Sequence, residues 1–252
     1  MHNAAFRALG LDDWLYLRLP VAPERFEEVA RALPRSGYTG VNVTIPHKEA
    51  ALAIADSTTP AAAQIGAANT LTFVAGGRIE AENTDAQGFL DALGEPVEGR
   101  SALILGAGGA ARAVAWALRE AGAGEVSVWN RTPERARRLA EDLGVRSVDR
   151  PTPADILVNA TSVGLEGSEA DLPLDAVGHP GVVADLVYGS ETPPVTAWAR
   201  ARGMRTVTGL EMLVRQGALS FRRWTGKDAP IDVMRDAVAT ADKPPTMRVP
   251  FR

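Results

Sequence analysis

The stretch SALILGAGGAA at residues 101–111 predicts a buried strand, a tight turn and the start of a helix. A helical pattern continues from this turn to about Ala121. The glycines follow the pattern G-x-G-x-x-A, in which Gly106 permits the turn and Gly108 lets the backbone approach a pyrophosphate. A loop that merely turns the chain is the alternative, but the flanking strand and helix favour a dinucleotide-binding site.

Further apolar runs follow this stretch and are separated by helical patterns. Such alternation predicts an α/β fold with a Rossmann-type, doubly wound parallel sheet. The runs lie at residues 126–129, 156–158, 182–187 and 205–207.

The first third of the chain predicts a smaller α/β unit. Apolar residues have helical spacing at 26–33, and they alternate with polar residues at 41–45, as in a half-buried strand. Segments 71–74 and 78–81 flank two glycines and predict a hairpin. A last helix, from about Leu210, has an apolar stripe that we expect to pack on this first unit.

These patterns predict a domain organisation in which the last helices complete the first domain. The predicted parts are a substrate-binding and catalytic domain at 1–93, an NADP-binding Rossmann domain at 94–209, C-terminal helices at 210–242 and a loose tail at 243–252.

Composition and charge exclude several other classes of protein. Lys and Arg total 27 against 31 Asp and Glu, giving a net charge of −4 that disfavours a nucleic-acid partner. The absence of Cys excludes disulfides and thiolate zinc sites, and the three His are too scattered to predict a metal site. No signal peptide or membrane span is predicted, so we expect a cytoplasmic protein. The sequence leaves the oligomeric state open, a homodimer included.

The residues after the second strand of the parallel sheet favour NADP(H) over NAD(H). An acidic residue there would repel a 2′-phosphate, but this chain has neutral Asn130. Arg131, Thr132 and Arg135 follow and offer two guanidinium groups and a hydroxyl at a helix start that Thr132 caps and Pro133 opens. The alternative is that these arginines form a solvated helix face.

Lys48 is a candidate for proton transfer. If Pro46 takes the first helical position, Lys48 lies in the first turn, where the helix dipole favours the neutral amine. Such a lysine can exchange protons with a carbonyl oxygen during hydride transfer. The alternative is an exposed surface lysine. Asp85 could act beside it at the domain border or could only cap the following helix.

Short motifs in the same order along nearly the whole chain resemble those of the shikimate dehydrogenases. That family reduces 3-dehydroshikimate to shikimate with NADPH, a step of chorismate and aromatic amino acid biosynthesis. The motifs are MHN at 1–3, NVTIPHK at 42–48, GAANT at 66–70, NTDAQG at 83–88, the glycine-rich loop at 106–111, NRT at 130–132, NATS at 159–162 and GLEMLVRQ at 209–216.

The resemblance implies roles for individual residues. It implies that Lys48 and Asp85 form the acid/base pair. It also implies that the hydroxylated ring is held between the domains by Thr44, Asn69, Tyr188 and Gln216. The implied cofactor-binding residues are Gly106, Ala107, Gly108, Gly109, Ala110, Asn130, Arg131, Thr132, Arg135, Thr161, Leu186 and Gly209.

The sequence departs from the family at its start, because the family normally has a strand and a loop with two serines before the position of Met1. We expect a chain without them to leave a sheet edge unpaired and to bind the substrate carboxylate roughly tens to thousands of times more weakly. Either the natural start lies upstream or the protein acts on another substrate; the retained Lys48, Asp85 and ring-binding residues favour the first explanation.

Two other functions stay open. One is a related oxidoreductase that acts on quinate, an aminoshikimate or another cyclic hydroxy acid. The other is an NADPH-binding module without turnover.

Overall fold

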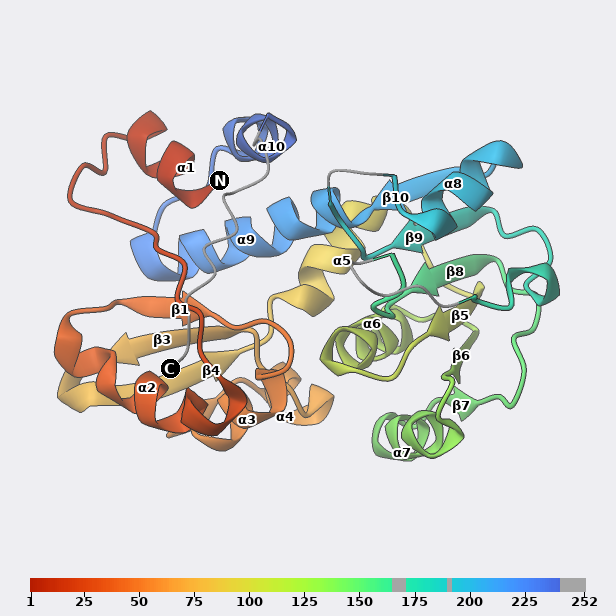
Figure 1. Ribbon diagram of the computed structural model, residues 1–252, viewed down its shortest axis with the longest axis horizontal. Helices are drawn as coiled ribbons and strands as arrows, with labels where there is room; N and C mark the ends of the chain where they lie inside the picture. The colour runs from red at the N-terminus through yellow and green to blue at the C-terminus, as the bar shows by residue number, and fades with distance from the viewer. Residues whose placement is uncertain (165–170, 190–191, 241–252) are drawn as a thin grey trace.

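The computed structural model describes residues 1–164, 171–189 and 192–240 and arranges them in two α/β units (Figure 1). Helices α5 (Asp85–Leu93) and α9 (Gly209–Thr225) pack against each other where the units meet. A Rossmann-type parallel sheet beside a smaller α/β unit is therefore confirmed. The predicted domain boundaries stay predictions, and the tail predicted at 243–252 lies outside the described residues. Within the described ranges, no helix has both the length and the apolar character needed to cross a membrane.

The smaller unit is built on a four-stranded sheet with the order β1-β3-β4-β2. β3 (Thr70–Val74) and β4 (Arg78–Glu82) form the predicted hairpin, in which Gly76 and Gly77 have φ angles of 80° and 74°. Glycine adopts such positive angles without strain, so the turn accounts for both residues. The other elements of this unit are α1 (His2–Ala8), η1 (Pro23–Arg25), α2 (Phe26–Ala32), η2 (Pro34–Ser36), β1 (Gly40–Asn42), α3 (Lys48–Ala53), β2 (Ser57–Thr58), α4 (Pro60–Ile65) and η3 (Ala75–Gly77).

The strand predicted at 41–45 is wrong in its length, because β1 covers only Gly40–Asn42. Beyond β1 the chain turns, and the His47 N–H donates to the Thr44 carbonyl at 2.9 Å. Ile45 lies on this turn and is 65% exposed, although the alternation placed it on a buried face. Among the described strands β1 pairs with β3 alone, so it forms one edge of the sheet.

The larger unit is a six-stranded parallel sheet with the order β10-β9-β8-β5-β6-β7. Leu105 at the end of β5 lies opposite both Trp129 of β6 and Asn159 of β8. Asn159 in turn lies opposite Asp185 of β9, so the carboxyl ends of these strands meet at one edge. The strand order reverses between β5 and β8, the place where doubly wound sheets bind ligands. The elements are β5 (Ser101–Leu105), α6 (Gly109–Glu120), β6 (Glu125–Trp129), α7 (Pro133–Leu143), β7 (Arg146–Ser147), β8 (Ile156–Asn159), η4 (Leu174–Ala176), β9 (Val182–Asp185), α8 (Pro194–Ala201) and β10 (Arg205–Thr208).

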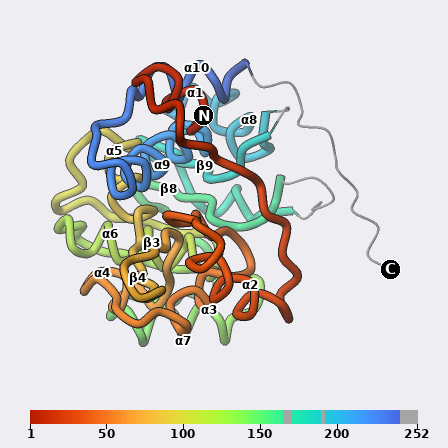
Figure 2. The backbone as a smooth tube through the Cα atoms, turned by 90° about the vertical axis from the view of Figure 1, so that its left-hand side faces the viewer, coloured from red at the N-terminus to blue at the C-terminus, as the bar shows by residue number. Residues whose placement is uncertain are grey.

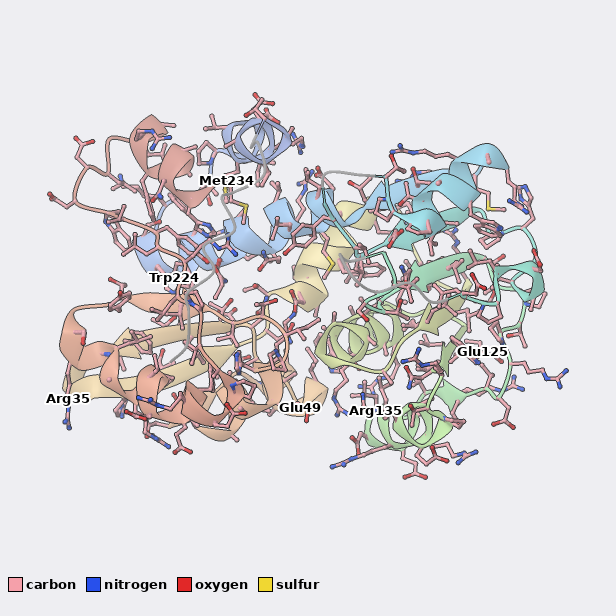
Figure 3. All side chains as sticks on the ribbon, in the orientation of Figure 1. Arg35, Glu49, Glu125, Arg135, Trp224 and Met234 are labelled. Atoms are coloured by element: carbon pink, nitrogen blue, oxygen red, sulfur yellow. The ribbon has the colours of Figure 1, made fainter. Side chains whose placement is uncertain are left out.

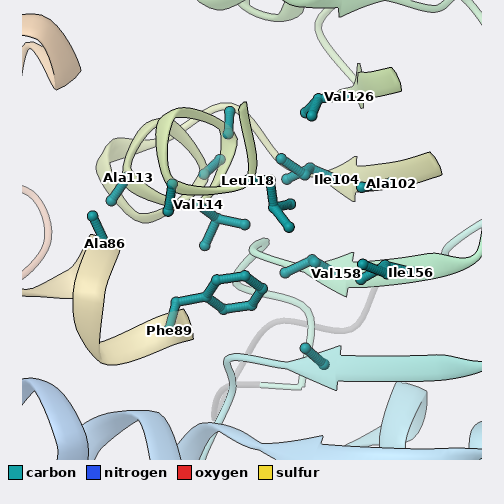
Figure 4. Close-up of a cluster of buried hydrophobic side chains, with 14 of the residues drawn as sticks. Ala86, Phe89, Ala102, Ile104, Ala113, Val114, Leu118, Val126, Ile156 and Val158 are labelled. Atoms are coloured by element: carbon teal, nitrogen blue, oxygen red, sulfur yellow. The ribbon is translucent and has the colours of Figure 1, made fainter. Parts of the chain in front are cut away.

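One buried core of the larger unit lies between its sheet and the helices α5 and α6 (Figure 4), and a second cluster joins the sheet to α8. Val114 and Leu118, one turn apart on α6, share a fully buried cluster with Phe89 of α5. Ile104 and Val158 belong to the same cluster on the sheet side. Burial of each large apolar side chain contributes about 1.5 to 3 kcal/mol, so this packing holds α6 against the end of β5.

Helix α9 leaves the larger sheet and returns to the smaller unit. Its Phe221 packs on Phe6 of α1 with 5.3 Å between ring centroids. Trp224 Nε1 donates to the Leu71 carbonyl of β3 at 3.2 Å. Figure 2 shows α1 and α10 (Ile231–Ala239) at the same end of the molecule, where both contact the α9 region. Helix α9 thus ties the two units together.

An ion-pair cluster around Glu211 joins α9 to α10. The Glu211 carboxylate accepts hydrogen bonds from Arg235 Nε at 2.9 Å and from Arg215 Nε at 2.8 Å. These bonds, led by the one from Arg235, lower the pKa of Glu211 to about 2. The cluster therefore stabilises the contact between the two C-terminal helices while Glu211 is ionised.

We expect Glu211→Gln to lower the free energy of unfolding at neutral pH by about 1 kcal/mol, because solvent screens partly exposed ion pairs. A carboxyl group with a depressed folded-state pKa stabilises the fold above its unfolded value of 4.5, and this is lost as the pH falls toward about 2. The difference between wild type and variant, measured by urea unfolding, should therefore shrink as the pH falls below 4.5. A difference that stays constant through this range would contradict the assignment.

Candidate active site

Lys48 and Asp85 form an ion pair at the point where two helices begin. Lys48 is the first residue of α3, and Asp85 is the first residue of α5. Lys48 Nζ donates to Asp85 Oδ2 at 2.6 Å, and the two side chains are only 12% and 7% exposed. The alternative of an exposed surface lysine is therefore wrong. The first-turn position predicted for Lys48 is confirmed, although α3 begins two residues after Pro46.

Asp85 does not cap its helix. Thr84 is the N-cap residue of α5, and the Ala86 N–H donates to Asn83 Oδ1 at 3.2 Å. The Asp85 carboxylate instead accepts from Lys48 and from Asn69. A carboxylate at the first helical position also interacts favourably with the positive end of the helix dipole. The capping alternative for Asp85 is therefore wrong.

Asn69 connects Asp85 to the neighbouring polar side chains. Its Nδ2 donates to Asp85 Oδ1 at 2.9 Å, to Thr84 Oγ1 at 3.0 Å and to Gln216 Oε1 at 3.2 Å. Because the amide carries two hydrogens, these three acceptors share them. Asn69 Oδ1 accepts from the Thr84 N–H at 2.7 Å, and its backbone carbonyl accepts from the Val43 N–H at 2.7 Å. The orientation of the Asn69 side-chain amide is thus fixed, because both its nitrogen and its oxygen have hydrogen-bond partners.

Gln216 reaches this group from α9, far along the sequence. Its side chain is almost fully buried, and its Nε2 donates to the Leu213 carbonyl at 2.8 Å. The close approach of α9 to α5 depends on Gly88, where an added Cβ would lie 2.7 Å from the Gln216 backbone nitrogen. Helix α9 therefore contributes a polar side chain to the group around Asp85.

The two other predicted ring-binding residues lie outside this hydrogen-bonded group. Thr44 lies on the exposed turn before α3. Tyr188 follows β9 and is 48% exposed. Partial burial raises the pKa of the Tyr188 hydroxyl; the nearby Lys48 ammonium lowers this pKa to a smaller extent, and the Asp85 carboxylate raises it. Tyr188 therefore lies within electrostatic reach of the ion pair.

The glycine-rich loop contacts Lys48 directly. A Cβ added at Gly109, the first residue of α6, would lie 3.2 Å from Lys48 Cβ and Cδ. Gly106 has a φ of 116°, and a Cβ there would lie 2.7 Å from the Ala160 carbonyl oxygen. At Gly108 an added Cβ would meet nothing within 4 Å, so the backbone faces open space. Ala107 and Ala110 complete the half-buried loop.

The predicted 2′-phosphate site lies between β6 and α7. Arg131 and Arg135 are exposed, and neither has an ion-pair partner among the described residues; Figure 3 labels Arg135 on α7. Arg137, in contrast, pairs with Glu134 at 3.4 Å. Thr132 is the N-cap residue, as predicted, but its hydroxyl makes no capping bond. Two guanidinium groups are thus available beside neutral Asn130, whose Nδ2 donates to the Thr132 carbonyl at 2.9 Å.

The remaining predicted cofactor residues lie at the carboxyl edge of the parallel sheet. Thr161 donates through Oγ1 to Asn159 Oδ1 at 2.7 Å. A Cβ at Gly209 would lie 2.5 Å from the Leu186 carbonyl oxygen, so glycine allows α9 to start beside β9. The loops after β8 and β9 and the start of α9 therefore meet at the sheet edge that carries the glycine-rich loop.

Sequence reasoning missed Asp185, which organises two of these loops. Its carboxylate is buried and accepts from Asn159 Nδ2 at 2.9 Å and from Thr196 Oγ1 at 3.1 Å. Burial raises the pKa of Asp185, and these hydrogen bonds oppose that effect. Sequence reasoning also gave no role to Thr84, although it lies in the quoted motif NTDAQG. Neither residue has a local pattern that distinguishes it from a cap or turn residue.

Family models match most of the chain. Residues 1–71 match the shikimate dehydrogenase substrate binding domain, residues 91–163 match shikimate / quinate 5-dehydrogenase, and residues 209–239 match the shikimate 5′-dehydrogenase C-terminal domain. Lys48 and Asn69 lie in the first match, the glycine-rich loop in the second and Gln216 in the third.

Relatives with these names align over nearly the full length. The shikimate dehydrogenase (NADP(+)) of Methanothermobacter thermautotrophicus is 47% identical over 94% of this chain and 89% of its own. A Thermus thermophilus shikimate 5-dehydrogenase structure, in complex with NADP(H) and shikimate, is 44% identical with a TM-score of 0.84, over 94% of this chain and 92% of that one. A 5-ketofructose reductase from Gluconobacter is 30% identical with a TM-score of 0.82, over 94% of this chain and 91% of that one. The chain belongs to the shikimate dehydrogenase family.

Proposed function

We propose that this chain is an NADP-dependent shikimate dehydrogenase that reversibly reduces 3-dehydroshikimate to shikimate in chorismate and aromatic amino acid biosynthesis. The observation that carries the proposal is the 2.6 Å ion pair of Lys48 and Asp85, which lies directly against the glycine-rich loop. A proton donor beside a dinucleotide loop is the arrangement that carbonyl reduction by hydride requires. The names of the relatives and the Thermus thermophilus complex support the substrate and the cofactor.

The polar groups around the ion pair suit a ring with several hydroxyls. Asp85 offers carboxylate acceptors, and the amides of Asn69 and Gln216 offer donors and acceptors. Thr44 and Tyr188 add hydroxyls at the exposed side of the same region. Convergent polar groups of this kind orient a small hydroxylated substrate.

The open space beside Gly108, at the start of the twelve-residue helix α6, fits a pyrophosphate. Arg131 and Arg135 would hold the 2′-phosphate, with neutral Asn130 adding no repulsion. Thr161, Leu186 and Gly209 would line the other side of the cofactor. When bound, NADPH supplies the hydride that reduces the carbonyl carbon.

Lys48 supplies the proton in this scheme. As the carbonyl carbon gains a hydride, the carbonyl oxygen gains negative charge and takes a proton from the Lys48 ammonium, which leaves a hydroxyl group. Asp85 holds Nζ in place through the 2.6 Å contact. In the oxidation direction, the neutral amine of Lys48 takes the hydroxyl proton back, and Asp85 stabilises the ammonium that forms.

The proposal is tested by the rise of NADPH absorbance when the purified chain is mixed with NADP⁺ and shikimate. Quinate and fructose serve as comparison substrates. Fructose is the alcohol that forms when 5-ketofructose is reduced, the reaction named for the Gluconobacter neighbour. The highest kcat/KM should be for shikimate. Turnover of another substrate but not of shikimate would support a related oxidoreductase, and NADPH binding without any turnover would support a binding module.

The cellular location, the absence of a nucleic-acid partner and the oligomeric state remain predictions. We expect the enzyme to lie in the cytoplasm and to act on a small molecule without a nucleic-acid partner. Either a monomer or a homodimer is compatible with the sequence. Cell fractionation and sedimentation of the purified protein test the first and the last of these.

Lys48→Met should lower kcat roughly 100- to 10,000-fold, the range that general acid–base catalysis contributes, with a much smaller change in KM. Methionine keeps the length of the side chain, so the packing against Gly109 is preserved. Lys227→Met is the matched control, because it makes the same substitution at an exposed lysine that follows α9 and belongs to none of the predicted sites. An unchanged kcat in Lys48→Met would show that another group transfers the proton.

Alanine at Gly106 and at Gly108 should separate folding from cofactor binding. Gly106→Ala should destabilise the fold by about 1 to 3 kcal/mol, because its positive φ disfavours alanine and its Cβ meets the Ala160 carbonyl. Gly108→Ala should keep the Tm of the wild type and weaken NADPH binding, because its methyl group enters the space open to the pyrophosphate. Thermal unfolding and NADPH fluorescence titration measure the two effects. Wild-type NADPH affinity in Gly108→Ala would refute this assignment of the pyrophosphate.

A further inference from the structure

Arg112 connects the two units next to the glycine-rich loop. It lies on α6, one turn after Gly109, and its side chain is 13% exposed. Arg112 Nε donates to the Ile65 carbonyl of α4 at 2.5 Å, across the boundary between the units. Its Nη1 pairs with Asp142 Oδ2 of α7 at 2.8 Å. The guanidinium group is therefore oriented from the larger unit while it binds the smaller one.

A second contact lies one turn further along α6. Trp116 Nε1 donates to Gln64 Oε1 of α4 at 2.8 Å. Gln64 and Ile65 are the last two residues of α4, so both contacts hold the same helix end. We call Arg112 and Trp116, with their partners Gln64 and Ile65, the α4–α6 latch.

The end of α4 leads within four residues to Asn69. Gly66 has a φ of 74°, and a Cβ there would lie 2.7 Å from Arg112 Nη2. The next residues are fixed as well, because the Ala68 N–H donates to the Lys48 carbonyl at 2.9 Å and Asn83 Nδ2 donates to the Ala67 carbonyl at 2.9 Å. A displacement of the α4 end relative to α6 would therefore move Asn69 and Lys48 relative to the glycine-rich loop.

Arg119 offers an internal comparison on the same face of α6, seven residues after Arg112. Arg119 Nη1 donates to the Leu143 carbonyl, at the end of α7. Both arginines thus bind the last carbonyl of a helix that ends in a left-handed glycine, Gly66 or Gly144. Arg119 makes this contact within the larger unit, whereas Arg112 makes it between the units.

We propose that Arg112 is a positioning residue, which sets the separation of the Lys48–Asn69 group and the glycine-rich loop through the α4–α6 latch. This inference rests on the proposed function for its catalytic consequence. Hydride transfer needs the reacting atoms held within a narrow range of distances, and displacement by about 1 Å can cost roughly 100-fold in rate. Arg112 therefore affects turnover through its contacts with Ile65 and Asp142, which set the position of α4 relative to α6.

The distance between the units can be measured without any activity. The chain has no Cys, so Arg35→Cys in η2 and Glu141→Cys in α7 give two unique sites for spin labels; both positions are exposed, and Figure 3 labels Arg35. We expect Arg112→Met to shift or broaden the distance distribution between the labels, and Arg119→Met to leave it as in the wild type. Equal distributions for the wild type and Arg112→Met would overturn the inference.

Kinetics give the second readout. Arg112→Met should lower kcat roughly 10- to 100-fold with smaller changes in the KM of shikimate and NADP⁺. Arg112→Lys, which keeps one donor, should recover part of the rate, and Arg119→Met should stay within about twofold of wild type. Trp116→Phe, which removes the indole donor and keeps a smaller aromatic ring, should give a smaller effect in the same direction. A kcat of Arg112→Met equal to that of Arg119→Met would overturn the positioning role. A wild type that does not turn over shikimate would overturn the proposed function instead, and the label distances would still test the latch.

Discussion

The ion pair of Lys48 and Asp85 is the interaction on which the active region depends. Two opposite charges with little exposed surface meet at 2.6 Å, each at the first residue of its helix. Removing either partner would leave an unpaired charge in a site with little access to water, which is costly. The pair therefore requires α3 and α5 to start at the same place, and the turn after β1 and the end of β4 bring them there.

Hydrogen bonds and glycine contacts hold this pair between the two units. Asn69 fixes the second carboxylate oxygen, and Gln216 of α9 joins the group. Gly88 lets α9 approach α5, and Gly109 lets α6 approach Lys48, because a Cβ at either position would meet the neighbouring chain at 3.2 Å or less. Polar partners thus orient the charged groups, and the absence of side chains at two positions lets the helices come close enough.

Sequence patterns predicted the elements whose signals are local. The apolar runs predicted the parallel sheet, and the glycines at 76 and 77 predicted the hairpin. The alternation through Ile45 predicted too long a strand, because the chain turns at Ile45 and Pro46 and a backbone hydrogen bond from His47 to Thr44 closes the turn. The roles of Arg112 and Asp185 could not be predicted, since their partners lie in distant segments. The pairing of Lys48 with Asp85 was predicted from the resemblance to the shikimate dehydrogenases and not from the spacing of the two residues in the sequence.

A double-mutant cycle on kcat/KM tests most directly whether Lys48 and Asp85 work as one unit. The cycle compares Lys48→Met, Asp85→Asn and the double variant with the wild type in the oxidation of shikimate by NADP⁺. If the Asp85 carboxylate acts only by orienting Lys48 Nζ and stabilising its ammonium form, the kcat/KM of the double variant should fall no further than that of the worse single variant. If the two losses multiply, the residues act independently and the ion pair is not the unit that transfers the proton.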